Sequence, residues 1–523
     1  MSDSDVLIVG AGPTGLVLAL WLTKLGVKVR IVDRTSGPGT TSRAMAVQAR
    51  TLELYRQVDL ARAVTDAANK VRQVHLWVRG KEVARVPFGE IGGDLTPFGF
   101  MYVFPQDAHE RLLVERLERL GVIVERETEL LSFVDDGEAV TAQLRTTPGE
   151  DKTCFCRFLA GCDGARSQVR EATGIGFPGG TYQQTFYVAD VVASGAAIND
   201  DLNVDLDQAD FAAIFPMAGK GRIRLIGAIR DQAAAAPRRP LQFKDVSHRA
   251  IDGMKLDVQK VNWFSTYHVH HRVAEHFRRG RAFLLGDAAH VHSPAGGQGM
   301  NTGIGDAINL AWKMAAVISG QAPDRWLDSY EAERAPFARR LVATTDRAFG
   351  FVSAEGPLAD ALRTRLAPLL LPRVLSIEAA QEYIFRTISQ LTLNYRGGPL
   401  SRGVAGHVHG GDRLPWVSEA GVDNHASLSA MTWQAHVYGG ASAELKNWCA
   451  ENAVALHQFR WSERYQSAGL AQDAVYLLRP DTYVAVADAK GSIAALDGYA
   501  SDTGLRFQRP NGNSPAWPLR SAG

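Results

Sequence analysis

The stretch Val6-Leu7-Ile8-Val9-Gly10-Ala11-Gly12-Pro13-Thr14-Gly15 decides how the chain begins to fold. Its apolar start predicts a buried strand, and its glycines lead into a helical apolar pattern over residues 15–25. A second apolar run, over residues 27–32, ends at Asp33. This order of strand, glycine-rich turn, helix and strand predicts a dinucleotide-binding βαβ unit.

The three glycines of this unit have different tasks. Gly10 allows the tight turn, Gly12 lets a pyrophosphate approach the backbone, and Gly15 lets the helix pack closely on the strand. The start of the helix carries about half a positive charge and faces the phosphates. Asp33 would accept hydrogen bonds from the ribose of an adenosine. The motif alone does not distinguish NAD from FAD.

A second glycine-rich segment follows an apolar run over residues 282–285. Gly286-Asp287 ends that run, and glycines up to Asn301 open a helix over residues 301–318. A carboxylate at a strand end can bind the ribityl hydroxyls of a flavin, and the new helix start lies where negative charge develops on the reduced isoalloxazine. Two dinucleotide features this far apart imply one extended ligand, FAD.

A third segment, Gly161-Cys162-Asp163-Gly164-Ala165-Arg166, again ends a strand and starts a helix. With three such motifs in order, residues 4–395 resemble the group A flavoprotein monooxygenases, the family of p-hydroxybenzoate hydroxylase, phenol 2-monooxygenase and the aromatic polyketide hydroxylases. The segment after residue 400 resembles the thioredoxin-like domain of the phenol and polyketide branches, through Leu478-Arg479-Pro480-Asp481. It contains no Cys-x-x-Cys, so we expect no redox activity there.

The expected fold is therefore α/β with three parts. A Rossmann-type FAD-binding domain takes residues 1–180 and 272–395, including a helical region after residue 350. An inserted antiparallel sheet that binds substrate takes residues 181–271, because strands and turns alternate there, as in residues 211–229. A Gly/Pro-rich linker at residues 396–399 precedes the thioredoxin-like domain, residues 400–523.

The resemblance also implies the site residues. It places the adenosine and pyrophosphate of FAD on Gly10, Gly12, Pro13, Thr14, Gly15, Asp33 and Arg34. It makes Arg43 and Gln106 contacts to the pyrophosphate and ribityl chain, Asp163 a contact to both FAD and NADPH (or NADH), and Asp287 the ribityl acceptor. The ring-binding loop is Pro294, Gly297, Gly299, Met300 and Asn301, of which Pro294, Gly297, Met300 and Asn301 are the expected catalytic positions. Asp33 stands where relatives more often have Glu, which shortens its reach to the ribose.

The function that the resemblance implies is hydroxylation of a phenolic or polycyclic aromatic substrate, with NADPH or NADH, O2 and a flavin C4a-hydroperoxide. Two alternatives stay open. One is a Baeyer–Villiger or epoxidising monooxygenase of the same family. The other is a flavin-containing protein that binds aromatic ligands without turnover. The sequence displays no catalytic base, and it does not identify the substrate.

Composition narrows the partners. Hydrophobic residues make up 46% of the 523-residue chain and the net charge is +1, which argues against binding to nucleic acid or anionic lipid. The apolar stretch over residues 16–25 is too short to span a bilayer, and the start lacks a signal-peptide pattern. We therefore expect a cytoplasmic monomer or homodimer with small-molecule partners.

Other conspicuous residues allow two interpretations each. The His290-x-His292 pair could suggest a metal, but further ligands at matching spacing are missing, so we expect loop hydrogen bonds and no metal. The spacing of the four cysteines matches no zinc or disulfide pattern. These cysteines are Cys154, Cys156, Cys162 and Cys449. Four arginines form a basic cluster in the sequence: Arg272, Arg278, Arg279 and Arg281. This cluster could attract a cofactor phosphate, or it could form a solvated face.

Overall fold

The computed structural model describes residues 3–39, 44–87, 91–147, 149–205, 212–229, 241–246, 249–293, 297–353 and 366–507. The chain divides into two compact units. The first comprises Met1–Leu20, Val29–Ile308 and Glu333–Leu393, and the second comprises Trp21–Lys28, Asn309–Ala332 and Asn394–Gly523. The second unit thus takes two segments that the sequence prediction assigned to the FAD-binding domain.

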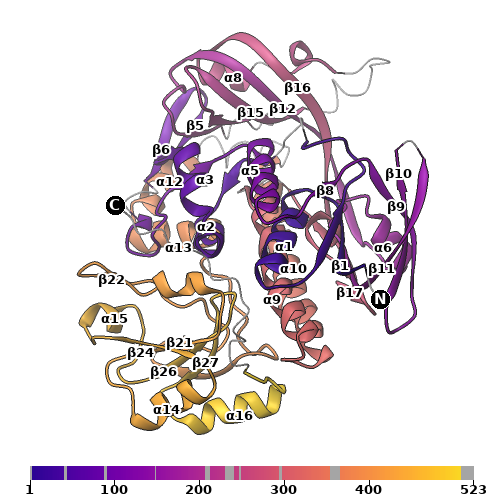
Figure 1. Cartoon of the computed structure of the whole chain (residues 1–523). Coiled ribbons are helices and arrows are strands. Elements are labelled where there is room, and N and C mark those ends of the chain that lie inside the picture. Colours follow the sequence, from indigo (N-terminus) through magenta and orange to yellow (C-terminus); the bar gives the residue numbers. More distant parts are fainter. Residues whose placement is uncertain are drawn as a thin grey trace. The chain divides into compact units, whose positions relative to one another are not determined.

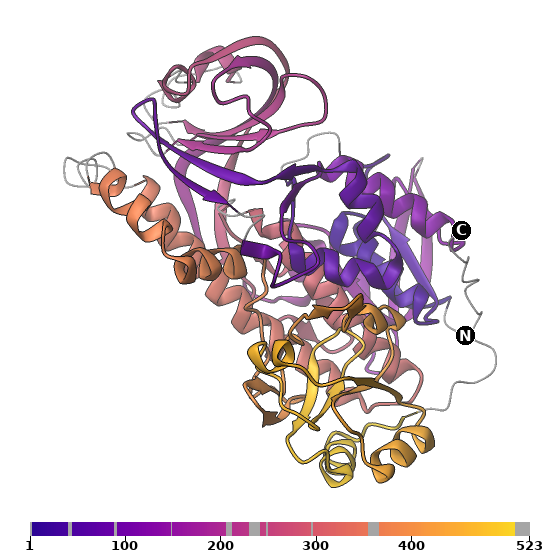
Figure 2. The same cartoon turned by 90° about the vertical axis from the view of Figure 1, so that its left-hand side faces the viewer.

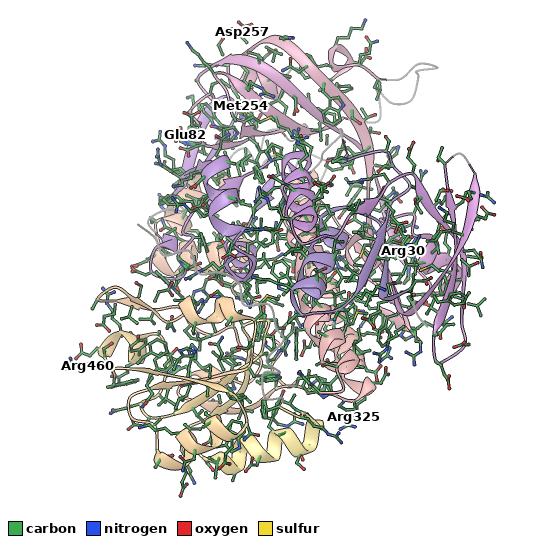
Figure 3. The ribbon with its side chains drawn as sticks, in the orientation of Figure 1. Arg30, Glu82, Met254, Asp257, Arg325 and Arg460 are labelled. Atoms are coloured by element: carbon green, nitrogen blue, oxygen red, sulfur yellow. The ribbon has the colours of Figure 1, made fainter. Side chains whose placement is uncertain are left out.

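A largely parallel sheet forms the first layer of the first unit (Figure 1). Its strand order is β17 (Arg278–Arg279), β18 (Ala282–Leu284), β11 (Glu150–Gly161), β1 (Ser4–Val9), β2 (Val29–Val32) and β8 (Val124–Glu125), and β10 (Val140–Thr146) and β9 (Thr128–Asp135) extend β11 antiparallel. Strand β1 is buried almost throughout, as expected for a central parallel strand. At the other end Arg30 of β2 forms two hydrogen bonds, of 2.7 and 2.8 Å, with Glu125 of β8 (Figure 3).

The helices confirm most of the predicted pattern. Helix α1 (Pro13–Lys24) follows the glycine turn and begins with proline, whose missing N–H costs nothing at a helix start. Helix α5 (Gln106–Glu118) and helix α9 (Gly299–Ile318) also lie where the apolar spacing placed them. Helix α10 (Asp328–Ser353) was not predicted, and it continues through Pro336. The remaining helices of this unit are α2 (Ala49–Tyr55), α3 (Ala61–Ala67), α6 (Gln168–Thr173), α8 (Arg249–Gly253), α12 (Ala367–Leu375) and α13 (Glu378–Ile388).

An eight-stranded sheet forms the second layer of this unit. Its order is β19 (His290–Val291), β16 (Leu256–Val273), β12 (Gly179–Gly195), β15 (Arg222–Ile229), β14 (Ala212–Pro216), β13 (Leu202–Asp205), β5 (Gln73–Val78) and β6 (Lys81–Pro87). Strands β12 to β16 confirm the predicted antiparallel pattern. Strands β5 and β6 come from the segment expected in the FAD-binding domain, and β5 pairs parallel with β13.

The two faces of this sheet have separate apolar clusters. One cluster contains Val191, Leu225 and the fully buried Met254, which follows α8 (Figure 3). The other contains Val188 and Ile226, together with residues of α12 and α13, which lie beside the sheet in orange in Figure 2. We call this second side the inner face.

The second unit has a six-stranded sheet of its own. The order is β21 (Val408–His409), β20 (Arg402–Ala405), β27 (Val484–Asp488), β26 (Val475–Leu478), β24 (Gln434–Tyr438) and β25 (Ala455–Phe459). Helix α14 (Ala443–Glu451) joins the parallel strands β24 and β25, the predicted hairpin β26–β27 follows, and α16 (Ile493–Thr503) is the last helix in the described residues.

Arg479 is the largest charged side chain in the core of the second unit. It is 1% exposed and makes a two-point hydrogen bond to Asp481, with Nε–Oδ1 and Nη2–Oδ2 distances of 2.9 and 2.5 Å. Its guanidinium lies 4.9 Å from the ring centre of Trp312 and 5.2 Å from that of Tyr395. The Leu478–Asp481 motif therefore supplies a buried ion pair inside an aromatic cluster.

Two further features of the chain concern its apolar helices and its cysteines. Among the described residues, no helix combines the length and apolarity needed to cross a bilayer. All four cysteines are buried and unbridged.

Candidate functional site

The predicted motifs meet at one edge of the parallel sheet. Asp287, Asp163, Gly10 and Asp33 follow the carboxyl ends of β18, β11, β1 and β2, which are four consecutive parallel strands. Ligands of open α/β sheets bind outside the carboxyl ends of the strands. The sheet thus brings residues from four distant segments into one line.

Steric contacts distinguish the three glycines at this edge. Gly10 has a φ of +105°, and a Cβ atom there would lie 2.3 Å from the carbonyl oxygen of Cys162. A Cβ on Gly15 would lie 2.0 Å from the carbonyl oxygen of Gly10. A Cβ on Gly12 would meet no other atom of the described chain within 4 Å. Gly10 and Gly15 are thus required by the protein's own packing, whereas Gly12 keeps the backbone open to a ligand.

Thr14 packs the first motif against the second. A Cβ on Gly286 would lie 2.6 Å from Thr14 Oγ1, and one on Gly303 would lie 2.3 Å from the same atom. Gly286 also has a φ of +59°, which favours glycine. The starts of α1 and α9 and the turn after β18 are therefore in close contact.

Asp33 binds the glycine loop itself. Its Oδ2 accepts the Ala11 N–H at 2.6 Å, and its Oδ1 accepts the Thr35 N–H at 2.8 Å and the Thr35 hydroxyl at 2.6 Å. A carboxylate offers about four acceptor positions, so these three bonds leave about one for a ribose hydroxyl. The neighbouring Arg34 is exposed and lines a pocket of about 270 Å³.

One carboxylate oxygen of Asp163 has no hydrogen-bond partner in the described part of the chain. Its Oδ2 accepts the Val169 N–H at 3.2 Å, at the start of α6. Its Oδ1 is buried and has no hydrogen-bond partner among the described residues. Burial raises the pKa of this carboxyl. A buried acceptor without a partner is unfavourable unless a ligand or water donates to it.

Asp287 is the exposed member of a buried segment. Residues 282–286 and 288–291 on either side are buried. The turn after β18 therefore places one carboxylate at the surface of the edge.

The loop before α9 is fixed through Asn301, which is 1% exposed. Its Nδ2 donates to the carbonyl oxygens of Ala46 and Gly297 at 2.8 and 3.1 Å. Its Oδ1 accepts the Gln48 N–H at 2.9 Å and the Thr51 hydroxyl at 2.8 Å. The side chain thus joins the start of α9 to the start of α2. Gly299 and Met300 are half-buried in the first turn of α9, and Arg43 and Pro294 lie outside the described residues.

A buried ionic network lies behind this loop. Asp306 is 0% exposed, and its carboxylate contacts His290 Nε2 and Arg334 Nε, each at 2.6 Å, and accepts the Gly286 N–H at 3.1 Å. Burial raises the pKa of Asp306, but the charges of Arg334 and His290 outweigh it and the net shift is downward. Asp306 was not among the site residues predicted from the sequence. A lone acid in the apolar helix α9 was the available signal, because buried charges need partners.

The two histidines of the His-x-His pair have separate partners. His290 contacts Asp306, and His292 donates from Nδ1 to the Ser293 carbonyl oxygen at 2.8 Å. Burial lowers the pKa of His292 to about 4. Within the described ranges, no three His, Cys, Asp or Glu side chains gather as metal ligands.

Gln106 and a second missed acid lie near the start of α5. Gln106 Nε2 donates to Glu110 Oε1 at 2.7 Å, and Glu110 Oε2 accepts the Gly39 N–H at 3.0 Å. Burial raises the pKa of Glu110, although both hydrogen bonds lower it. The pair therefore holds the segment that follows Asp33.

Comparison with known proteins identifies the family. Residues 3–345 match the family described as FAD binding domain. The 6-methylpretetramide 4-monooxygenase of Streptomyces rimosus is 37% identical over 439 residues, which cover 82% of this chain and 76% of that protein. The chain belongs to the FAD-dependent aromatic hydroxylases.

Two further relatives mark the range of the family. The crystal structure of CabE, described as an aromatic hydroxylase from angucycline biosynthesis, has a TM-score of 0.77 and 28% identity, and the match covers 97% of this chain and 100% of that one. A dialkyldecalin synthase of Streptomyces rugosporus is 34% identical over 348 residues, 66% of this chain and 72% of that protein. The predicted α/β fold class and flavoprotein monooxygenase family are confirmed.

The edge of the hydroxylase fits FAD by its own geometry. Gly12 leaves space at the helix start for a pyrophosphate, and Asp163 Oδ1 is a buried acceptor without a described partner. Asp287 exposes a charged acceptor at the end of the same row of strands. These three features are complementary to the polar groups of an extended dinucleotide.

Proposed function

We propose that this hydroxylase adds one oxygen atom from O2 to a phenolic or polycyclic aromatic substrate, with NADPH or NADH as reductant. One observation carries the proposal. Ala46 belongs to the apolar cluster on the inner face, and its carbonyl oxygen also accepts a hydrogen bond from Asn301 of the predicted ring loop. A large apolar surface with aromatic side chains therefore adjoins the cofactor edge. One relative is named a 6-methylpretetramide 4-monooxygenase, and this name supports a polycyclic substrate for the present enzyme.

The residues predicted for FAD would divide its length among them. Asp33, Arg34 and the segment Gly10–Gly15 would hold the adenosine and pyrophosphate, Asp287 the ribityl chain and the segment Gly297–Asn301 the ring, and Asp163 would contact both FAD and NADPH. FAD, when bound, supplies the electron and oxygen chemistry of the reaction. Asn301, with four hydrogen bonds to protein, would position the loop. In this proposal residues 181–271, extended by β5 and β6, bind the substrate and exclude water from it.

A row of basic side chains is our proposed contact for the phosphates of NADPH. His268, His270 and Arg272 alternate along β16 and so share one face of the strand. His270 Nδ1 lies 2.7 Å from Thr181 Oγ1, and burial lowers its pKa, helped by the charges of Arg272, His268 and Arg166. The Nε atom of Arg272 is buried without a hydrogen-bond partner in the described part of the chain. Arg166 belongs to the Asp163 motif, so this row joins the predicted NADPH motif.

The other arginines of the basic cluster have structural bonds. Arg278 donates to the Gly280 carbonyl oxygen at 2.8 Å, and Arg281 donates to that of Gly137 at 2.8 Å. Arg279 donates to the carbonyl oxygen of Thr173. We therefore narrow the proposed phosphate contact to Arg272.

Stimulated NADPH oxidation tests the proposed function. Purified protein with FAD is mixed with NADPH and with phenols, hydroxyphenyl acids or polycyclic quinones, and the rate of NADPH oxidation is measured. The masses of the products are then determined by mass spectrometry after reaction under ¹⁸O₂. We expect faster oxidation with one class and a product heavier by one labelled oxygen. Arg272→Gln should raise the KM for NADPH and Arg279→Gln should not. A flavin that is never reduced, or a product without label, would contradict the proposal.

The relative named a dialkyldecalin synthase is not named a monooxygenase, and it favours a second candidate function, a flavin-containing protein that binds aromatic ligands without turnover. Such a protein would bind FAD and an aromatic ligand, yet the ligand would not change the rate of NADPH oxidation. A Baeyer–Villiger outcome is separated by the product, in which the new oxygen lies within an enlarged or opened ring.

A further inference from the structure

A charged pair interrupts an apolar row on the inner face. Strand register places Trp263 of β16 opposite Asp190 of β12, Asp190 opposite Arg224 of β15, and Arg224 opposite Phe215 of β14. Directly opposed residues share one face of a sheet. Trp263 and Phe215 belong to the inner-face cluster, so the two charges lie between aromatic side chains.

The pair has a fixed geometry. Arg224 Nε donates to Asp190 Oδ1 at 2.5 Å, and Arg224 Nη2 donates to Asp190 Oδ2 at 2.7 Å. The arginine side chain is 4% exposed and the aspartate side chain 17%. The guanidinium lies 5.9 Å from the ring centre of Trp263. Apolar side chains at such positions often give equal or higher stability, so stability alone does not account for this ion pair.

The charged pair of Asp190 and Arg224 lies on the inner face of the sheet. Val188 and Ile226, two positions away along the same strands, belong to the inner-face cluster that also contains Ala46. Val191 and Leu225 pack on the other face. Asp190 therefore lies on the side of the sheet whose cluster reaches the predicted ring loop, and it is the more exposed partner.

We propose that Asp190 accepts a hydrogen bond from a hydroxyl group of the aromatic substrate, and that Arg224 is its positioning residue. A carboxylate offers about four acceptor positions, and the two bonds from Arg224 leave two of them. The flanking Trp263 and Phe215 supply apolar contacts for a ring. Hydrogen bonding to a carboxylate also moves electron density onto the phenol oxygen and its ring, which favours hydroxylation. This inference rests on the proposed function for its substrate class.

A binding experiment separates this inference from turnover. The probes are 2-hydroxyanthraquinone and its methyl ether 2-methoxyanthraquinone, titrated into FAD-loaded protein while the flavin absorbance is followed. We expect the hydroxyl compound to bind at least about tenfold more tightly, the range of one charged hydrogen bond. The preference should fall below about threefold in Asp190→Asn.

A charge-free variant keeps the test valid if a single change unfolds the protein. Asp190→Leu combined with Arg224→Met removes both charges of the pair together, so it should fold, bind FAD and bind both probes equally. Lys152→Met, at an exposed pair with Glu150, is the control and should keep the preference.

Three results would overturn the inference: no binding of either probe to the parent, equal binding of both, or an unchanged preference in folded, FAD-loaded variants. If the preference follows Asp190 but no compound stimulates NADPH oxidation, the proposed function fails while the contact stands.

Discussion

The cofactor edge and the inner face of the eight-stranded sheet differ in how the sequence encodes them. At the edge, a motif can show part of its requirement within a few residues, as when Gly15 makes room for the carbonyl oxygen of Gly10. At the inner face, Asp190, Arg224 and Trp263 come from three strands and meet only through register. A site built from backbone requirements is therefore visible in sequence, and a site built from strand pairing is not.

The largest expected effect separates two glycines of the same motif. Gly15→Ala places a Cβ 2.0 Å from the Gly10 carbonyl oxygen, which α1 cannot avoid without moving, so we expect insoluble protein or a much lower melting temperature. Gly12→Ala meets no described protein atom and should leave the melting temperature of the FAD-free protein unchanged.

Titration of the Gly12→Ala protein with FAD completes this comparison. Its Kd for FAD should rise at least about tenfold, because the methyl group occupies the space of the pyrophosphate. Equal affinity in the variant and the parent would show that the phosphates do not approach Gly12.

The next effect concerns the ionic network behind the edge. Asp306→Asn leaves Arg334 buried without its charge partner, and removing one member of a buried pair costs about 3 to 5 kcal/mol. Urea unfolding would measure this loss. The exposed pair of Arg145 and Asp151 gives the control, since Arg145→Gln should leave the urea midpoint unchanged. An unchanged midpoint in Asp306→Asn would mean that the network does not stabilise the loop.

These residues also mark what the sequence could predict. The four strand ends, α1, α5, α9 and the hairpin β26–β27 were predictable, because periodicity and glycine positions act over short distances. The segment that contains β5 and β6 was expected in the FAD-binding domain, but both strands belong to the eight-stranded sheet, where β5 pairs with β13, which lies far along the chain. Helix α10 was missed because Pro336 is a helix breaker that tertiary packing overrode. Asp306 and Glu110 were missed because partners decide the role of a buried acid, and the sequence does not show partners.

An acid-sensitive group inside the first unit gives the third prediction. His109 of α5 is 0% exposed, its Nε2 lies 2.7 Å from the Tyr55 hydroxyl oxygen, and burial lowers its pKa to about 4 from 6.5. The unfolded chain therefore takes up a proton below pH 6.5 while the folded protein does not until about pH 4. The contribution of neutral His109 to the free energy of unfolding is fully present above pH 6.5. It falls by about 3 kcal/mol as the pH drops to 4.

Urea unfolding at several pH values checks the assignment to His109. His109→Gln keeps a polar group beside Tyr55 but does not titrate, so its free energy of unfolding should fall less between pH 6.5 and 4. Parallel curves for variant and parent would place the acid sensitivity in other groups, such as His292.

The smallest effect returns to the cofactor edge and asks how much one exposed side chain adds to a site that backbone geometry already forms. Asp287→Ala removes a charged acceptor for the ribityl hydroxyls, a type of bond worth about 1.5 to 3 kcal/mol, so FAD should bind roughly ten- to a hundredfold more weakly. Because Asp287 is exposed, the melting temperature of the FAD-free protein should change little. Asp151→Ala removes the same charge at an exposed position of β11 and should leave the Kd for FAD as in the parent. Fluorescence titration with FAD measures all three proteins. If Asp287→Ala binds FAD like the parent, the glycine loop and Asp163 suffice for the cofactor, and the edge depends on backbone even more than the comparison with the inner face implies. If Asp151→Ala weakens binding equally, the effect is one of net charge and not of a contact at the end of β18.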